Sequence, residues 1–391
     1  MRIFPDLIGN LLMFVILINY NSGIKWLGLA KLNRSHKQEL DGFTRSECEY
    51  ARKIQVLRKR HFRFCLHHKH RFAMHAVLMA SKATVYYCMK TFADRRWNCK
   101  SVEKLPKLPP DLKLGTQEQA VVHAFSSAAL VFEISRRCSQ NKLRHCSCGK
   151  DESDANVGSN NQNYTYYYSN CLDNIDIGIE STRNFLGFHQ MGMKSKDSDS
   201  KSENKKPNKQ NKSQIIKRLN GHNYEVGIMI MMNSWKSKCK CHGVSGSCIN
   251  KICFRQLRRL DDEELLKMIK DYYLRAKHVT MEDDNKLYPT HFITTGLQKE
   301  PLKTTDLAFI EHSSDYCEPD PSAGSIGTQG RQCETVNVTL SKTNHCSNMC
   351  CGRGYREVME KETVQCRCEL VDVYIVKCKQ CIQINIRKFC L

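Results

Sequence analysis

The spacing of four cysteines in the middle of the chain constrains its fold more than any other feature. Cys239 and Cys241 precede a short Gly/Ser loop, and Cys248 and Cys253 follow it at nearly mirrored positions. Mirrored spacing is what residues facing each other across an antiparallel hairpin show, so we expect the pairs Cys239–Cys253 and Cys241–Cys248. The sequence therefore predicts a β-hairpin over residues 239–253 whose exposed tip carries His242, Gly243, Val244, Ser245 and Gly246.

A second set of cysteines near the C-terminus follows the same rule. Cys366 and Cys368 mirror Cys381 and Cys378, which predicts a second hairpin over residues 366–381 with Cys350–Cys390 joining its base. Apolar side chains on a projecting tip need a partner; the alternative is that alternate residues pack against the hairpin's own base. The apolar residues of this tip are Leu370, Val371, Val373, Tyr374, Ile375 and Val376.

The cysteine content also indicates the compartment. Twenty-two cysteines are too many for the reducing cytosol, and an even number permits eleven disulfides with none left over. The N-terminus agrees, because Arg2 precedes an apolar run from Leu11 to Ile18 that has the length of a signal-peptide core and is too short to span a bilayer. We expect a signal peptide over residues 1–23, with cleavage as late as residue 30 as the second option and a retained signal anchor as the alternative.

A formal charge of +21 restricts the partners. A basic secreted protein is attracted to acidic glycans and anionic surfaces, whereas secretion and the lack of a zinc-finger or similar signature exclude nucleic acid. An insertion over residues 192–213, rich in Lys, Ser and Asn, is predicted to be disordered. It is either a solvated loop or a contact for heparan sulfate.

The order of patterns predicts two domains joined by a linker. The first, residues 24–276, is mostly helical and includes the first hairpin; residues 277–303 are expected to be an irregular linker. From residue 304 to 391 cysteines are frequent and helical periodicity ends, which predicts a small domain held by disulfides. Helices are expected over residues 47–94, 118–137, 177–188, 215–235 and 257–276.

Ser245 can be interpreted in several ways. As an unmodified residue it would belong to a structural loop. As a catalytic nucleophile it fails, because the G-x-S-x-G elbow needs glycine where Ser247 stands and no nearby Asp or Glu could orient His242. Zinc binding by Cys239 and Cys241 is disfavoured, since such cysteines are usually disulfide-bonded in an oxidising compartment. We therefore expect no enzyme activity, no cofactor and no metal.

Several motifs in one order resemble the Wnt family of secreted, lipid-modified signalling ligands. The resemblance extends from about residue 45 to residue 391. The motifs are Arg95-Arg96-Trp97-Asn98-Cys99, Glu118-Gln119-Ala120, the run from Cys239 to Cys248 closed by Cys253, Cys317-Glu318-Pro319, the run from Gly327 to Cys333, and the run from Cys350 to Gly354.

This resemblance implies an α+β, disulfide-rich fold of two domains. The helical N-terminal domain would carry the first hairpin as a lipidated thumb, and the cystine-rich C-terminal domain would carry the second as an index finger. As in many relatives, Cys48 is expected to pair with Cys65. The further pairs that the resemblance implies are Cys88–Cys99, Cys138–Cys146, Cys148–Cys171, Cys317–Cys351 and Cys333–Cys346.

The resemblance also implies a function. Ser245 would be esterified with palmitoleate by the acyltransferase Porcupine in the endoplasmic reticulum, and Wntless would carry the product to the extracellular space and matrix. The thumb would enter a groove in the cysteine-rich domain of a Frizzled receptor, the finger would contact its opposite side, and a low-density-lipoprotein-receptor-related protein would act as co-receptor. The outcome would be Wnt signalling in development.

One feature departs from the usual pattern of that family. The family usually has an aromatic residue and two adjacent cysteines at the finger tip, where this chain has Asp372-Val373-Tyr374. The alternative function is that of a basic, disulfide-rich matrix protein that binds glycosaminoglycans without activating a receptor. Both functions fit a glycoprotein with sequons at Asn33, Asn163, Asn211 and Asn337.

Overall fold

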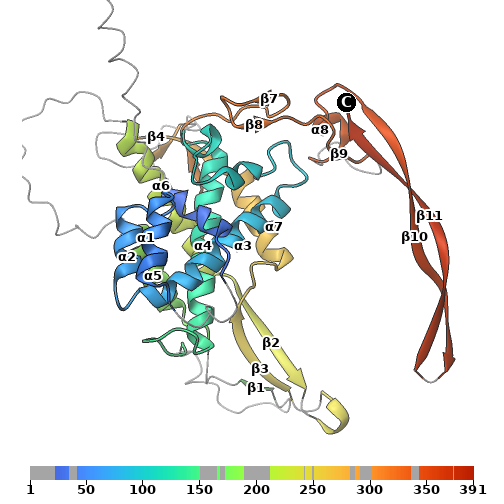
Figure 1. Cartoon of the computed structure of the whole chain (residues 1–391), viewed down its shortest axis with the longest axis horizontal. Helices are drawn as coiled ribbons and strands as arrows, with labels where there is room; N and C mark the ends of the chain where they lie inside the picture. Colours follow the sequence, from blue (N-terminus) through green and yellow to red (C-terminus); the bar gives the residue numbers. More distant parts are fainter. Residues whose placement is uncertain are drawn as a thin grey trace, which may run out of the picture.

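The structure is a computed structural model in which a helical body carries two long hairpins (Figure 1). It describes residues 23–34, 42–149, 165–167, 172–188, 212–241, 243–248, 251–281, 287–290, 302–335, 343–372 and 374–391. The α+β, disulfide-rich fold expected from the sequence is confirmed, with helices in the first part of the chain and mostly strands in the last.

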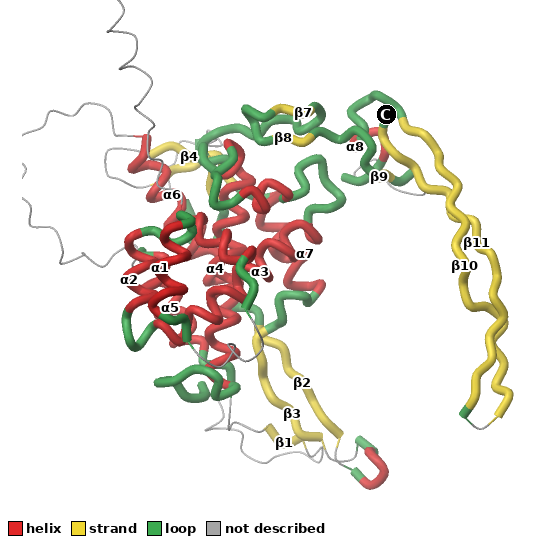
Figure 2. Tube along the Cα trace, in the orientation of Figure 1, coloured by secondary structure: helices red, strands yellow, loops and turns green. Residues whose placement is uncertain are grey.

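Figure 2 separates the helices from the strands along the chain. The helices are η1 (Gly23–Lys31), α1 (Arg45–Lys53), α2 (Lys59–Leu66), η3 (Arg71–Ala73), α3 (Met74–Thr91), η4 (Lys100–Lys104), η5 (Pro110–Leu112), α4 (Gln117–Ser139), α5 (Ile175–Leu186), α6 (Lys212–Met232), η7 (Val244–Gly246), α7 (Glu263–Leu274) and α8 (Cys346–Met349). The strands are β1 (Thr165–Tyr167), β2 (Trp235–Cys241), β3 (Lys251–Leu257), β4 (Lys277–Met281), β5 (Leu287–Pro289), β6 (Ala308–Phe309), β7 (Pro319–Asp320), β8 (Ser325–Ile326), β9 (Gln332–Cys333), β10 (Tyr355–Asp372) and β11 (Ile375–Cys390).

Helix α4 is the centre of the helical body and contacts α3, α5, α6 and α7. Helix α4 is buried along most of its length, and its apolar residues are therefore spread around the helix instead of forming one stripe. The approach of α6 is close: a Cβ at Gly227 would lie 2.0 Å from the carbonyl oxygen of Ala124. Glycine is therefore required at this crossing of α4 and α6.

Two segments differ from the sequence-based expectation. The helix predicted over residues 257–276 begins only at Glu263, because Leu257 ends strand β3 and the Asp262 side chain caps the helix by accepting the Glu264 N–H at 3.1 Å. Part of the expected linker is ordered, since β4 pairs with β5 and with β6. Buried Val279 and Leu287 give these short strands a small apolar cluster of their own.

The C-terminal domain is held by disulfides more than by an apolar core. Its buried cluster consists of Met349 and four half-cystines, Cys333, Cys346, Cys350 and Cys390. The hairpin predicted over residues 366–381 is much longer in the structure, because β10 and β11 pair from Tyr355 opposite Cys390 to Asp372 opposite Ile375. Strand β9 adds to β11 at the base of this hairpin.

Within the described residues the structure joins ten pairs of cysteines. They agree with the pairs stated above, and Cys171, the expected partner of Cys148, lies outside the described residues. The pairs are Cys48–Cys65, Cys88–Cys99, Cys138–Cys146, Cys239–Cys253, Cys241–Cys248, Cys317–Cys351, Cys333–Cys346, Cys350–Cys390, Cys366–Cys381 and Cys368–Cys378.

One buried carboxylate connects the helical body to the segment that leads into the C-terminal region, and a second lies within the body. Glu118 on α4 accepts hydrogen bonds from the Tyr273 hydroxyl at 3.0 Å and from the Ser313 hydroxyl at 2.5 Å. Asp111 accepts the Trp97 indole N–H at 2.9 Å. Burial raises the pKa of Asp111 to about 6, although the bond from Trp97 opposes the shift.

Substitution of Asp111 by asparagine should change how stability depends on pH. A carboxyl whose folded-state pKa is about 6 and whose unfolded pKa is about 3.9 stabilises the fold at low pH and loses that contribution as pH rises through this window. The unfolding free energy of D111N minus that of the wild type should therefore increase by up to about 3 kcal/mol between about pH 4 and pH 7. Urea unfolding of both proteins at several pH values measures this difference, and a difference independent of pH would contradict it.

Candidate functional site

The first hairpin, strands β2 and β3, projects from the helical body as the thumb (Figure 1). Cys239 lies directly opposite Cys253 in the register, and their Cα atoms are 3.9 Å apart. Cys241 and Cys248 close the loop beyond them with their Cα atoms 4.5 Å apart. The two disulfides act as successive braces below the tip, so the tip is held on a rigid stem.

The base of the thumb is fixed by a buried carboxylate that the sequence did not reveal. Asp173 accepts the Leu257 backbone N–H at 2.9 Å, where β3 ends, and also the Ser139 hydroxyl at 2.8 Å. Arg136 forms an ion pair with it at 3.3 Å. Since Ser139 and Arg136 belong to α4, Asp173 ties the thumb to the central helix. No motif marks this residue, because its three partners come from distant parts of the chain.

The tip of the thumb is a single turn that presents Ser245. The Gly243 N–H donates to the Ser247 carbonyl at 2.8 Å, and the Gly246 N–H donates to the Gly243 carbonyl at 2.9 Å. A Cβ at Gly243 would lie 1.9 Å from Ser247 Oγ, so a larger residue does not fit where the chain closes on itself. Gly246 has a φ of +76°, which favours glycine.

Ser245 and Val244 extend outward from this turn. Val244 is 90% exposed, and Ser245 is exposed with a left-handed φ of +55°. The Ser245 hydroxyl forms no hydrogen bond with any residue that the structure describes. His242, the remaining residue of the predicted tip, lies outside the described residues.

The second hairpin, strands β10 and β11, ends in an apolar tip. Tyr374 is 94% exposed and Leu370 is 70% exposed, and the side chains of Val371, Ile375 and Val376 are exposed as well. The alternative that these residues pack against the base of the hairpin is therefore wrong for them. Val373 lies outside the described residues.

An exposed apolar stripe on the stem of this hairpin was not predicted. Ile382, Ile384 and Ile386 alternate along β11 and are exposed, and Met359 lies opposite Ile386 on β10. Alternation of this kind normally marks a strand with one covered face. The isoleucines at every second position are a sequence signal for this stripe. The hairpin was predicted from the cysteine spacing alone, which does not include them.

A pair of arginines holds the base of the second hairpin against the helical body. Arg331 donates from its guanidinium to the backbone carbonyls of Arg96 at 2.6 Å and Ala93 at 2.8 Å. In return, Arg96 donates to the Asn348 carbonyl at 2.8 Å. Two of the sequence motifs thus meet in space, and their arginines connect the base of the finger to the helical body. In Figure 1 both hairpins extend toward the same end of the molecule.

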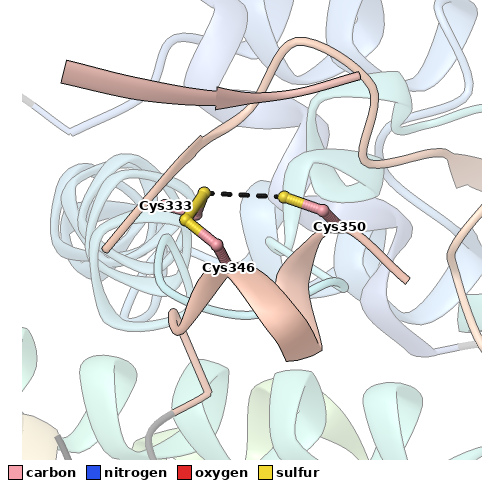
Figure 3. Close-up of side chains that lie close together, drawn as sticks. All are labelled: Cys333, Cys346 and Cys350. Atoms are coloured by element: carbon pink, nitrogen blue, oxygen red, sulfur yellow. Dashed lines mark hydrogen bonds between the residues drawn. A yellow bond between two sulfur atoms is a disulfide. The ribbon is translucent and has the colours of Figure 1, made fainter. Parts of the chain in front are cut away.

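Three cysteine sulfurs in the C-terminal domain lie close enough together to resemble a metal site. Figure 3 shows Cys333, Cys346 and Cys350, whose sulfur atoms lie within 4.8 Å of one another. Cys333 is bonded to Cys346, and Cys350 is bonded to Cys390. A metal ligand would have to be a thiolate, so this cluster is a contact between two disulfides.

One of the four predicted glycosylation sites lies in the part of the chain that the structure describes. Asn33 is exposed, while the sequons at Asn163, Asn211 and Asn337 lie outside the described residues, as does most of the insertion over residues 192–213. In the part of the chain that the structure describes, every helix is too short or too polar to pass through a bilayer.

Comparisons with known proteins identify the family of the chain and a solved structure of similar fold. The family model described as "wnt family" matches residues 53–391. Protein Wnt-11 of Xenopus laevis is 34% identical over 382 residues, 96% of each chain, and Protein Wnt-1 of Caenorhabditis elegans is 29% identical over 97% of each chain. In fold, a chain of the solved complex "Human WLS in complex with WNT8A" aligns with a TM-score of 0.51 and 23% identity, covering 83% of this chain and 96% of that one. With its family motifs in order along nearly the whole length, the chain belongs to the Wnt family.

Proposed function

We propose that this protein is a secreted ligand acylated on Ser245, which inserts its acyl chain into a groove of the cysteine-rich domain of a Frizzled receptor and so starts Wnt signalling. One observation carries the proposal: an exposed serine hydroxyl, with no hydrogen-bond partner among the described residues, stands at the tip of a narrow hairpin braced by two disulfides. An acyltransferase needs a hydroxyl on such a projection, because the hydroxyl must reach a catalytic site that the body of the protein cannot enter.

The acyl transfer would require only an accessible hydroxyl group from this chain. The Ser245 oxygen would replace the sulfur of an activated acyl thioester, and its proton would leave with the thiol. Membership of the family supports Porcupine as the enzyme that performs this step. The relative solved with human WLS supports a Wntless-type carrier for export, since a buried acyl chain of about 0.8 kcal/mol per CH₂ resists release into water.

The finger would provide the second receptor contact. Its tip offers exposed apolar side chains, Leu370, Val371 and Tyr374 to Val376, to the opposite side of the same receptor domain. A low-density-lipoprotein-receptor-related protein would join as co-receptor. In this scheme the protein acts by binding alone and needs no cofactor beyond the covalent lipid.

Mass spectrometry of the secreted protein tests the proposal directly. We expect the reduced peptide spanning Lys240 to Lys251, from cells that contain the acyltransferase, to carry the mass of a palmitoleoyl group on Ser245. A bare serine on efficiently secreted protein would overturn the lipid mechanism. That result would favour the alternative of a basic matrix protein that binds glycosaminoglycans without activating a receptor.

A further inference from the structure

Two disulfides of the C-terminal domain lie in contact at the base of the finger. Cys333–Cys346 and Cys350–Cys390 are separate bridges, yet the Sγ atoms of Cys333 and Cys350 are 3.5 Å apart (Figure 3). Cys333, Cys346 and Cys350 form the only group of three cysteines among the described residues whose sulfurs all lie within 4.8 Å of one another. All four half-cystines are at most 3% exposed, so the surrounding fold keeps the two bridges together.

Contact between two bridges permits a reaction that an isolated disulfide cannot undergo. A thiolate attacks one sulfur of a disulfide, a new bridge forms, and the other sulfur leaves as a thiolate. If the bridge between Cys333 and Cys346 opens, a thiolate on Cys333 already lies beside the sulfur of Cys350. Its attack would form the bridge Cys333–Cys350 and release Cys390. Because the fold holds the reacting sulfurs in place, this step is intramolecular and needs no further reagent.

Cys346 is the sulfur that an entering thiol reaches most readily. It begins α8, a single turn of four residues, and its carbonyl accepts the Cys350 N–H at 3.0 Å. So short a helix has little stability of its own, and local opening exposes its side chains to solvent. Cys333 belongs to β9, which pairs with β11 in the sheet at the base of the finger. An entering thiol should therefore bond to Cys346 and displace Cys333, which stays in the sheet next to Cys350.

We propose that these two bridges are a thiol–disulfide exchange site that accepts a small thiol such as glutathione. The sulfur of the small thiol bonds to Cys346, and the bond between Cys346 and Cys333 breaks. The Cys333 thiolate then bonds to Cys350, the bond between Cys350 and Cys390 breaks, and Cys390 takes up the proton that the small thiol has lost. Two disulfides and one thiol are present before and after, so the exchange needs no oxidant and no reductant.

The exchange would loosen the base of the finger without unfolding it. The bridge Cys350–Cys390 is the covalent link between the end of β11 and the C-cap residue of α8. After the exchange, hydrogen bonds would hold β11 there, since the Cys390 N–H donates to the Arg331 carbonyl and the Gly330 N–H to the Cys390 carbonyl, both at 2.9 Å. An effect on receptor binding rests on the proposed function of the finger, whereas the exchange itself does not.

A variant with one unpaired cysteine tests the exchange in the secreted, full-length protein. In Cys346→Ser, the Cys333 thiol has lost its partner, and we expect it to displace Cys390 and bond to Cys350. Free thiols are alkylated in denaturant with excess reagent, and the labelled peptides are identified by mass spectrometry. The label should be found on Cys390 instead of Cys333.

Cys65→Ser is the matched control, because it leaves a thiol on the equally buried Cys48, which belongs to no group of adjacent sulfurs among the described residues. Its label should stay on Cys48. Movement of the label to other cysteines in this control would mean that thiols exchange generally, which would overturn the proposal. A label on Cys333 in Cys346→Ser, with the second bridge intact, would overturn it as well.

Wild-type protein treated with glutathione gives a second measurement that needs no variant to fold. We expect glutathione on Cys346 and a free thiol on Cys390. Glutathione on Cys346 with the thiol on Cys333 would contradict the proposal, as would the absence of glutathione from both bridges. Neither measurement depends on the acyl mass at Ser245, so failure here is distinguishable from failure of the proposed function.

Discussion

Substitution of Ser245 by alanine should weaken binding to the receptor's cysteine-rich domain by at least about 1,000-fold. A long acyl chain buried at about 0.8 kcal/mol per CH₂ contributes at most about 10 kcal/mol. Half of that bound already corresponds to more than three powers of ten in affinity, since roughly 1.4 kcal/mol is tenfold. The substitution should leave the conformation of the exposed turn unchanged, because the Ser245 hydroxyl has no hydrogen-bond partner among the described residues. Binding of detergent-solubilised protein to the immobilised receptor domain provides the measurement.

Ser247 supplies the matched control within the same loop. Its Oγ is buried and has no hydrogen-bond partner among the described residues, so Ser247→Ala should change stability by no more than about 0.5 kcal/mol. The control variant should keep the acyl group and the receptor affinity of the wild type. Equal affinity of Ser245→Ala and the wild type would show that the lipid does not mediate binding. An equal loss in Ser247→Ala would attribute the effect to the shape of the loop.

The cysteine spacing predicted the hairpins because disulfide geometry is local and demanding. Cys239 and Cys253 must face each other closely, so mirrored positions indicate an antiparallel pair before any strand is recognised. The same logic found the second hairpin through Cys366 and Cys381 but not its length. Strands β10 and β11 continue far below the disulfides, where exposed side chains give no apolar pattern on β10 to indicate pairing.

Tertiary contacts account for what the sequence could not predict. Asp173 fixes the thumb through Leu257, Ser139 and Arg136, and no motif along the chain connects Asp173 to these residues. Arg96 and Arg331 each stand in a recognisable motif, yet their contact across more than 200 residues of sequence appears only in the fold. The short strands β4 and β5 form in a segment whose own pattern is irregular, because β6 and the buried Val279 hold them.

The burial of η1 favours one of the two expected cleavage sites of the signal peptide over the other. Ile24, Trp26, Leu27 and Leu29 are at most 1% exposed and belong to the main core. Cleavage as late as residue 30 would remove all four, whereas cleavage of residues 1–23 retains them. We therefore propose the earlier site, and N-terminal sequencing of the secreted protein should find Ile24 or an earlier residue first.

Replacement of Trp26 by alanine should then destabilise the mature protein by about 3 to 5 kcal/mol, the range for a large aromatic side chain removed from a packed core. Its ring packs edge-to-face on Phe185 at 5.4 Å between ring centres, so α5 loses a contact along with η1. Lys25→Ala, on the same helix but only partly buried, should cost far less. Urea unfolding followed by circular dichroism compares the two. If Trp26→Ala and Lys25→Ala have equal free energies of unfolding, η1 does not contribute to the core that stabilises the secreted chain. Cleavage as late as residue 30 would then be compatible with a stable protein.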